Sequence, residues 1–375
     1  MAWSINSWQN FTTKHMPKYH EDITDIKTQL AKKDSIVDSK SIDELLLLLS
    51  KVNDSNYFIM QMGECAELFA NATKEDIFSR VNFIEEVCRY FPESLNIIKI
   101  GRIAGQYSKP RSEDFEIIND EKTLVYKGDM FHDYMNREIK ASRMLLSADV
   151  SKRTYDIMQK FNQEIFTSHE ALNLHYEEGF TRLINSKYYN TSAHMLWLGE
   201  KTRFLNSSHV EYLRGISNPV GIKISHNISS ADLIKIIRLL NPENIPGKIV
   251  LINRMGVKNT HLYLENLLQE VKNTNLNVIW MCDPLHGNTY KDSNNYKVRN
   301  LTDIIKEITD FAIILYKHKV KFGGIHLENS PKDIYECVDG SMRNIGEKYE
   351  TLCDPRLNKE QSFTIAKLLA KLIQN

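Results

Sequence analysis

The sequence predicts an α/β fold in which eight parallel strands close into a barrel and helices cover it, a (β/α)8 or TIM barrel. Eight short apolar runs recur along the chain, and nearly every run ends in a residue able to bind a metal ion, a phosphate group or a proton. In such barrels the active site is built at the carboxyl ends of the strands, so reactive groups collect there. The expected strands are 57–62, 95–100, 193–198, 220–224, 249–252, 278–281, 322–327 and 349–352.

Between these runs lie patterns typical of amphipathic helices. Thr73 precedes a helical pattern over 74–91, and Ser229 with Asp232 forms a capping pair before 233–240. Further helices are expected at 261–271, 302–318 and 359–373. Each of these helices follows a strand, as crossover connections between parallel strands require.

Two regions are longer than a minimal barrel requires. We expect residues 1–55, with a helix near 42–49, to form an N-terminal extension packed on the barrel, and residues 56–375 to form one catalytic barrel domain. Within that domain a helical insertion is expected at about 113–190, between strands 2 and 3, with helices around 130–146 and 151–166. A chain of 375 residues, of which 42% are hydrophobic, can bury a core of this size in a single domain.

The composition argues against several classes of function. Lys plus Arg and Asp plus Glu both total 48, so no net charge attracts nucleic acid or an anionic membrane surface. No apolar stretch has the length of a signal peptide or a membrane span, so we expect a soluble, cytoplasmic protein. The five cysteines are an odd set without paired spacing, which indicates reduced thiols or metal ligands rather than a disulfide framework.

Four residues that can bind a metal stand at or just after different predicted strand ends: Cys65, His286, Glu328 and Asp354. One thiol, one imidazole and two carboxylates suit a divalent transition metal with an open position for substrate, such as Mn, Fe, Co or Zn. Taken singly, Cys65 is explained equally well as a buried thiol and Asp354 as a helix cap. A metal site and a set of structural residues therefore both stand as interpretations at this point.

A second set of residues is cationic. Lys223 and Arg254 lie inside or at the end of apolar strands, where an unpaired charge is costly, so each needs an anion. Several cations at different strand ends suit a substrate with phosphate and carboxylate groups, although pairing with carboxylates such as Glu200 explains any single one equally well. The set comprises Arg102, Lys109, Arg111, Lys201, Arg203, Lys223 and Arg254.

Four further residues lie near the predicted strand ends or the predicted ligands. His169 and Glu170 precede an amphipathic pattern, so we interpret them as helix caps or as supports for a site. His194, within the third predicted strand, is interpreted as an interior histidine with satisfied hydrogen bonds. Cys353 adjoins Asp354, and a disulfide with Cys65 would disable the metal site under oxidation, with an inert packed thiol as the alternative.

Seven long segments carry a resemblance to a known family. They are GECAE (63–67), GRIAGQYSKPRS (101–112), WLGEKTR (197–203), HVEYLRGISNPVGIKI (209–224), VIWMCDPLHGNT (278–289), GGIHLE (323–328) and YETLCDPRLN (349–358). These segments resemble those of the class II 3-deoxy-D-arabino-heptulosonate 7-phosphate (DAHP) synthases, which open the shikimate pathway. The resemblance spans nearly the whole chain from Cys65 onward.

The resemblance implies a reaction and a role for each site residue. Phosphoenolpyruvate would condense with erythrose 4-phosphate and water to give DAHP and phosphate, with a divalent ion (Mn, Co or Fe, with Zn also compatible) as cofactor. The implied catalytic groups are Lys109, working with His286 as general acid, and Glu200, which would position the attacking water. The implied metal ligands are Cys65, His286, Glu328 and Asp354. The implied phosphoenolpyruvate contacts are Arg102, Glu200, Lys201, Lys223 and Arg254, and those on the erythrose 4-phosphate side are Lys109, Arg111 and Ser112.

Departures from the family pattern leave two alternatives open. Lys201 stands where the family has Arg, and Glu64 stands where it has Asp. A point charge at position 201 could permit an amino analogue of the sugar phosphate as substrate, and a non-catalytic homologue that regulates a partner is the second alternative. The segment 112–167 is short, as in members that serve secondary, phenazine-type pathways. A homo-oligomer is also expected.

Overall fold

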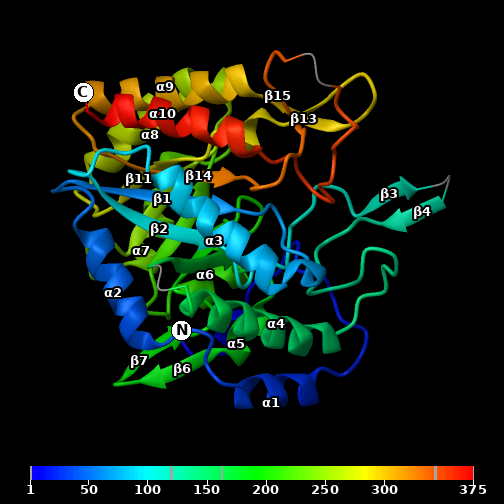
Figure 1. Ribbon diagram of the computed structural model, residues 1–375. Helices are drawn as coiled ribbons and strands as arrows, with labels where there is room; N and C mark the ends of the chain where they lie inside the picture. The colour runs from blue at the N-terminus through cyan, green and yellow to red at the C-terminus, as the bar shows by residue number, and fades with distance from the viewer. Residues whose placement is uncertain (1, 119–120, 162–163, 342–343, 375) are drawn as a thin grey trace.

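The computed structural model describes residues 2–118, 121–161, 164–341 and 344–374, and a closed barrel of eight strands lies at its centre (Figure 1). Every neighbouring pair of barrel strands runs parallel, which confirms the predicted (β/α)8 class. In order around the barrel the strands are β1 (Tyr57–Gly63), β14 (Phe322–Glu328), β11 (Ile279–Cys282), β10 (Ile249–Asn253), β9 (Val220–Ile224), β8 (Met195–Leu198), β5 (Phe166–Glu170) and β2 (Asn96–Arg102).

One barrel strand lies where none was predicted. Seven of the eight predicted runs form barrel strands, but 349–352 forms no strand, and the eighth member of the barrel is β5. Apart from Phe166, this strand consists of Thr, Ser, His and Glu, so it lacks the apolar run that marks the others. The third barrel strand is therefore β5, and 193–198 corresponds to the fourth.

Extra segments lie on both sides of β5. Between β2 and β5 stand the hairpin β3 (Phe115–Ile118) and β4 (Glu121–Leu124) and the helix α4 (Ser142–Gln159), so the helix expected around 130–146 begins only at Ser142. Residues 162–163 of the other expected helix lie outside the described part of the chain. Between β5 and β8 follow α5 (Leu174–Gly179), β6 (Thr181–Ile184) and β7 (Lys187–Asn190).

The outer helices follow the barrel strands as predicted. Thr73 caps α3 by accepting the backbone N–H of Asp76 at 3.1 Å, and Ser229 caps α7 by accepting that of Asp232 at 3.1 Å. The helices are α3 (Lys74–Cys88), α6 (Ser208–Leu213), α7 (Ser230–Leu240), α8 (Val257–Lys272), α9 (Leu301–Lys317) and α10 (Lys359–Gln374). A small sheet of β12 (Tyr290–Lys291), β13 (Lys297–Asn300) and β15 (Cys337–Val338) adds to this frame.

The N-terminal segment contains η1 (Ser7–Asn10), α1 (Thr24–Lys32) and α2 (Ser39–Ser50), and α2 fills the base of the barrel. Asp38 caps α2 by accepting two backbone N–H groups. Leu45 and Leu49 are fully buried against inward-facing side chains near the strand starts, such as Ile59 and Ile98. This apolar plug closes the amino end of the barrel, so the opposite end is the one left open for chemistry.

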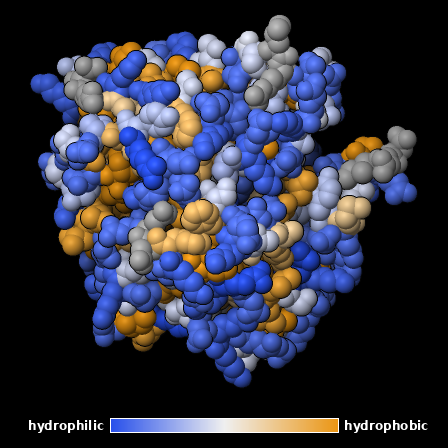
Figure 2. Space-filling model, viewed as in Figure 1, coloured by the Kyte–Doolittle hydropathy of each residue, from blue (hydrophilic) through white to orange (hydrophobic). Residues whose placement is uncertain are grey.

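Hydrophilic residues dominate the face in Figure 2, with apolar patches dispersed among them. The β3–β4 hairpin projects from the body and exposes Phe115 and Ile117 (Figures 1 and 2). Within the described ranges, we find no helix with both the length and the apolar character needed to cross a bilayer.

The plug predicts unequal costs for two substitutions on α2. Leu45→Ala should lower the free energy of unfolding by about 2–5 kcal/mol, because truncation of a buried leucine loses apolar contacts and leaves a cavity. Leu47→Ala, at a position that is 59% exposed, should change it by less than about 0.5 kcal/mol. Urea denaturation measures both values, and equal losses would contradict the role of α2 as a plug.

Candidate active site

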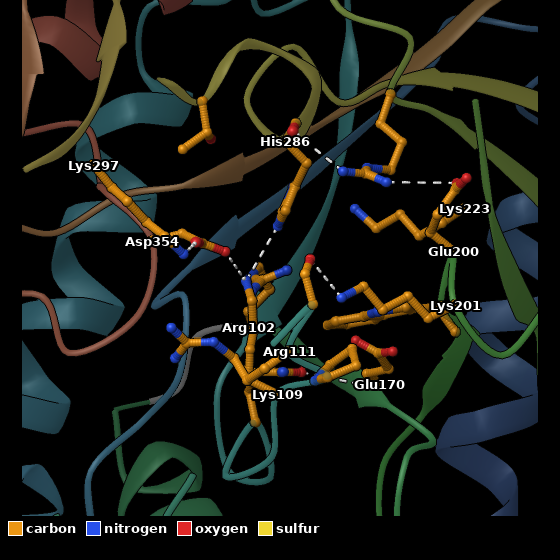
Figure 3. A pocket seen from close by; sticks show the side chains of 17 residues that line it. Arg102, Lys109, Arg111, Glu170, Glu200, Lys201, Lys223, His286, Lys297 and Asp354 are labelled. Atoms are coloured by element: carbon orange, nitrogen blue, oxygen red, sulfur yellow. Dashed lines mark hydrogen bonds and ion pairs between the residues drawn. The ribbon is translucent and has the colours of Figure 1, made fainter. Parts of the chain in front are cut away.

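A cavity of about 240 Å³ opens at the carboxyl ends of the barrel strands (Figure 3). Its lining includes every residue predicted to contact substrate: Arg102, Lys109, Arg111, Ser112, Glu200, Lys201, Lys223 and Arg254. Seven cationic side chains line it, because Lys297 joins the Arg and Lys residues of that set, whereas only three carboxylates do so (Glu170, Glu200 and Asp354). This excess of positive charge favours an anionic ligand.

The four predicted metal ligands lie around the Lys109 ammonium group, and two of them, His286 and Asp354, line the cavity. Cys65 follows β1, His286 lies in η3 (His286–Asn288) after β11, Glu328 ends β14, and Asp354 lies in the loop before α10. Figure 3 shows Lys109, His286 and Asp354 pointing toward one another. The Nζ atom of Lys109 lies 3.0 Å from Cys65 Sγ, 3.3 Å from His286 Nε2, 3.0 Å from Glu328 Oε1 and 3.0 Å from Asp354 Oδ2. A single cation at this point therefore contacts all four donors.

This donor set fits a divalent transition metal. The sulfur of Cys65 and one carboxylate oxygen each from Glu328 and Asp354 lie within 4.8 Å of one another. His286 Nε2 lies 2.9 Å from Glu328 Oε1. Thiolate and imidazole favour Mn, Fe, Co or Zn over Mg, so the residues present suit the type of ion that the sequence suggested.

Opposite charges fix the protonation states in this cluster. Burial alone would raise the pKa of Glu328, but His286 and Lys109 hold it well below its usual range. Burial lowers the pKa of Lys109, yet Asp354, Cys65 and Glu328 raise it well above its ordinary value. Burial also raises the pKa of Cys65, so metal binding through its sulfur must release a proton.

Surrounding groups orient the four donors. His286 Nδ1 lies 2.7 Å from Asp283 Oδ2, which directs Nε2 toward the cluster. Arg299 donates to Glu328 Oε2 at 2.9 Å, and Lys297 donates to Asp354 Oδ1 at 3.0 Å. Both cations belong to β13, a short strand outside the barrel whose composition resembles a polar surface, so the sequence analysis missed them.

The guanidinium of Arg102 is bonded mainly to other protein groups, which leaves little of it for a substrate. Its guanidinium stands 5.0 Å above the ring of Trp197 and has five N–H groups. Four of these are used, by the Glu64 carbonyl (2.8 Å), His326 Nε2 (2.6 Å), the Cys65 carbonyl (3.0 Å) and Glu328 Oε1 (3.0 Å). One N–H remains for a ligand.

His326 is not a fifth metal ligand, although it lies in a group with Asp283 and His286. Arg102 can only donate, so His326 Nε2 must accept. Its Nδ1 then donates to Gln61 Oε1 at 2.7 Å. Both ring nitrogens are therefore engaged inside the barrel.

The remaining cations surround two carboxylates. Glu200 Oε2 forms ion pairs with Arg203 at 3.0 Å and with Arg254 at 3.5 Å, and these cations hold the pKa of Glu200 below its ordinary value although burial opposes the shift. Lys223 pairs with Asp283 at 2.5 Å. The pairing of these cations with carboxylates, one of the two interpretations of the cationic set, is thus present alongside the net positive charge of the cavity.

Two lysines on this wall have pKa values well below the ordinary value for lysine. Lys201 donates to Ser112 Oγ at 2.7 Å. Burial lowers the pKa of Lys201 to about 8 and that of Lys223 to about 8. Both side chains are charged below that value, so a phosphate group meets two ammonium groups under mildly acidic and neutral conditions.

Glu170 is not a helix cap, and its role as a support for the site stays a prediction. It ends β5 and lines the cavity, and burial raises the pKa of its carboxyl group. Its neighbour His169 points away, toward Glu177 at 2.9 Å. His194 is an interior histidine, as predicted, since its Nδ1 accepts the backbone N–H of Thr167 at 2.9 Å.

A model of the class II DAHP synthetase family matches residues 3–163 and 154–370. The chain belongs to this family. The phospho-2-dehydro-3-deoxyheptonate aldolase of Neurospora crassa is 30% identical to it, with 98% of this chain and 94% of that protein covered. The enzymes of that name from Mycolicibacterium smegmatis and Streptomyces coelicolor are 30% and 29% identical, and the matches cover 89% and 99% of this chain and 86% and 97% of those proteins.

A solved structure shares the fold. It is that of a phospho-2-dehydro-3-deoxyheptonate aldolase from Francisella tularensis, with a TM-score of 0.58 and 16% identity, and the match covers 95% of this chain and 99% of that one. The resemblance drawn from the strand-end motifs is therefore confirmed, and this DAHP synthase is a transferase of class II.

Cys65, one of the predicted metal ligands, and its neighbour Cys353 predict sensitivity to oxidation. Cys65 and Cys353 are both free thiols and pack in one cluster with Tyr126. Peroxide should inactivate the enzyme by joining them, and a thiol reductant should restore activity. The Cys353→Ser variant should keep its activity under the same peroxide treatment. A variant as sensitive as the original protein would contradict the disulfide.

Proposed function

We propose that this DAHP synthase condenses phosphoenolpyruvate with erythrose 4-phosphate and water, with a divalent metal ion held by Cys65, His286, Glu328 and Asp354. The observation that supports this best is that one cavity wall combines the four-donor cluster with an excess of cations. Two phosphorylated substrates need those cations, and an aldehyde needs an electrophilic centre beside them.

Phosphoenolpyruvate would lie against Lys201, Lys223 and Arg254. The Nε atom of Arg254 is buried and has no hydrogen-bond partner among the residues described, so it is available to a phosphate or carboxylate oxygen. Arg102 would add its one uncommitted N–H. Two anionic groups on one small substrate thus meet cations from four different strand ends.

Erythrose 4-phosphate would enter beside Arg111 and Ser112, with Lys109 between the two substrates. A bound metal ion would supply Lewis-acid polarisation of the aldehyde. C3 of phosphoenolpyruvate then forms a bond to the aldehyde carbon, and Lys109, supported by His286, delivers a proton from Nζ to the former aldehyde oxygen. Holding both substrates on one wall lowers the entropic part of the barrier.

The second half of the reaction needs water at C2. Glu200 is ionised and fixed by Arg203, so it can accept a hydrogen bond from a water molecule that adds to C2. Cleavage of the C2–O bond then releases phosphate, which the surrounding cations stabilise. The oxygen atom of water thereby becomes the C2 oxygen of DAHP, in place of the oxygen that leaves with phosphate.

The reaction itself is tested by measuring phosphate release from phosphoenolpyruvate. Release should require both erythrose 4-phosphate and a metal, so Mn or Co should support it and EDTA should abolish it. An amino analogue of erythrose 4-phosphate tests the first alternative, the substrate that Lys201 could permit. Tight binding of phosphoenolpyruvate without turnover would instead favour a regulatory homologue.

The lowered pKa values of Lys201 and Lys223 predict where activity declines at alkaline pH. The kcat/KM for phosphoenolpyruvate should fall above a pH of about 8, because the free enzyme loses protons from Lys201 and Lys223 there. Lys201→Arg keeps its charge at every accessible pH and should lose one proton fewer in that range, so the decline should be shallower. An identical alkaline decline in the variant would exclude Lys201 from phosphate binding.

The wider setting of the enzyme is still inferred from the sequence. Service in a secondary, phenazine-type pathway rests on the short segment 112–167 alone. The homo-oligomer and the cytoplasmic location likewise stay predictions.

A further inference from the structure

Two loops that carry groups of the candidate site touch each other directly. One follows β10 and carries Arg254, and the other follows β11 and carries His286. They meet at two glycines: a Cβ atom on Gly256 would lie 2.5 Å from the carbonyl oxygen of Gly287, and one on Gly287 would lie 2.3 Å from the Gly256 nitrogen. Arg254 Nη2 also donates to the His286 carbonyl at 3.2 Å. The spacing of Arg254 and His286 therefore depends on this contact.

One side chain outside the cavity is bonded to both loops. Glu307 of α9 is fully buried, and its Oε1 accepts the Gly256 N–H at 2.8 Å and the Thr260 hydroxyl at 3.2 Å. Its Oε2 accepts from Asn288 Nδ2 at 2.6 Å. Asn288 in turn accepts the Val257 N–H at 2.9 Å. The outer helix α9 is thus hydrogen-bonded to both loops through the carboxyl group of Glu307.

A fully buried glutamate usually has a cationic partner, but we find no ion pair to Glu307 in the described ranges. Burial raises its pKa to about 8, and hydrogen bonds from Gly256, Asn288 and Thr260 oppose that shift. A glutamine cannot reproduce these contacts, since its amide nitrogen donates and does not accept, whereas both carboxyl oxygens of Glu307 can accept even when the group is protonated. With its oxygen toward Gly256, the NH₂ of a glutamine would face the NH₂ of Asn288.

We propose that Glu307 is a positioning residue that fixes Arg254 relative to His286, and so fixes phosphoenolpyruvate relative to the metal ligands. The proposal rests on the function proposed above. Neither Glu307 nor Asn288 lines the part of the cavity described. Their effect on the reaction must therefore pass through the two loops, at Gly256 on one and Asn288 on the other.

Exchanging the carboxyl group of Glu307 and the amide group of Asn288 tests the proposal. Glu307→Gln should raise the KM for phosphoenolpyruvate and lower kcat/KM about tenfold or more, because the loops that carry its phosphate contact shift. Asn288→Asp should do the same, because two carboxyl groups then face each other. The double variant restores the hydrogen bond between positions 307 and 288 with its direction reversed, but it loses the 2.8 Å bond from Asn288 to the Pro284 carbonyl, so kcat/KM should rise above that of either single variant without reaching the original value.

A control separates this effect from loss of stability. Glu211 is also buried, and it binds Ser7 Oγ and Arg214 outside the cavity. Glu211→Gln should lower the melting temperature without changing the KM for phosphoenolpyruvate. A double variant no better than the single ones, or a Glu307→Gln variant that loses stability only, would overturn the proposal.

Hydrogen exchange followed by mass spectrometry gives a readout that needs no substrate. Amides in 253–260 and 284–289 should exchange faster in each single variant and return toward the original rate in the double variant. Absence of turnover in the unmodified protein would contradict the proposed function, whereas unchanged exchange in Glu307→Gln would contradict the positioning role alone.

Discussion

The buried carboxylate of Glu328 holds the catalytic end of the barrel together. Its oxygens accept from Arg102 (3.0 Å), Lys109 (3.0 Å) and Arg299 (2.9 Å), and Oε1 lies 2.9 Å from His286 Nε2. A buried carboxylate without partners would cost several kcal/mol, so these contacts are a condition of burial rather than an addition to it. They bring β2, its following loop, the loop after β11, and β13 to the end of β14.

The polar interior around Glu328 explains which barrel strands could be predicted from the sequence. Seven strands were predicted because Val, Ile, Leu and Met fill the lower interior of the barrel and the layer beneath the helices. β5 escaped notice because its side chains serve the polar upper interior: Ser168 donates to the Gly101 carbonyl at 3.0 Å and accepts from Gln61 at 2.9 Å. The run 349–352 has suitable residues, but the eight paired strands already close the barrel without it.

The site residues also divide into those at the ends of barrel strands, which could be predicted, and those outside the barrel, which could not. Residue type and position at a strand end sufficed to select Cys65, His286 and Glu328, because the barrel brings those ends together. Asp354 was selected through a strand that does not exist, and it reaches the cluster from a loop. Lys297 and Glu307 had no such signal, since β13 and α9 lie outside the barrel and only the folded chain shows what they touch.

The donors that remain free indicate how the site recognises an anion. Four of the five N–H groups of Arg102 are hydrogen-bonded to the protein. Lys201 has an ammonium group, a point charge, at the position where the family pattern has the forked guanidinium of arginine. Ammonium groups attract phosphate without fixing its direction. In the proposed complex, directional recognition of phosphoenolpyruvate would therefore fall mainly on Arg254, whose Nε is free among the described contacts. The placement of the loop that carries Arg254 gains importance for that reason.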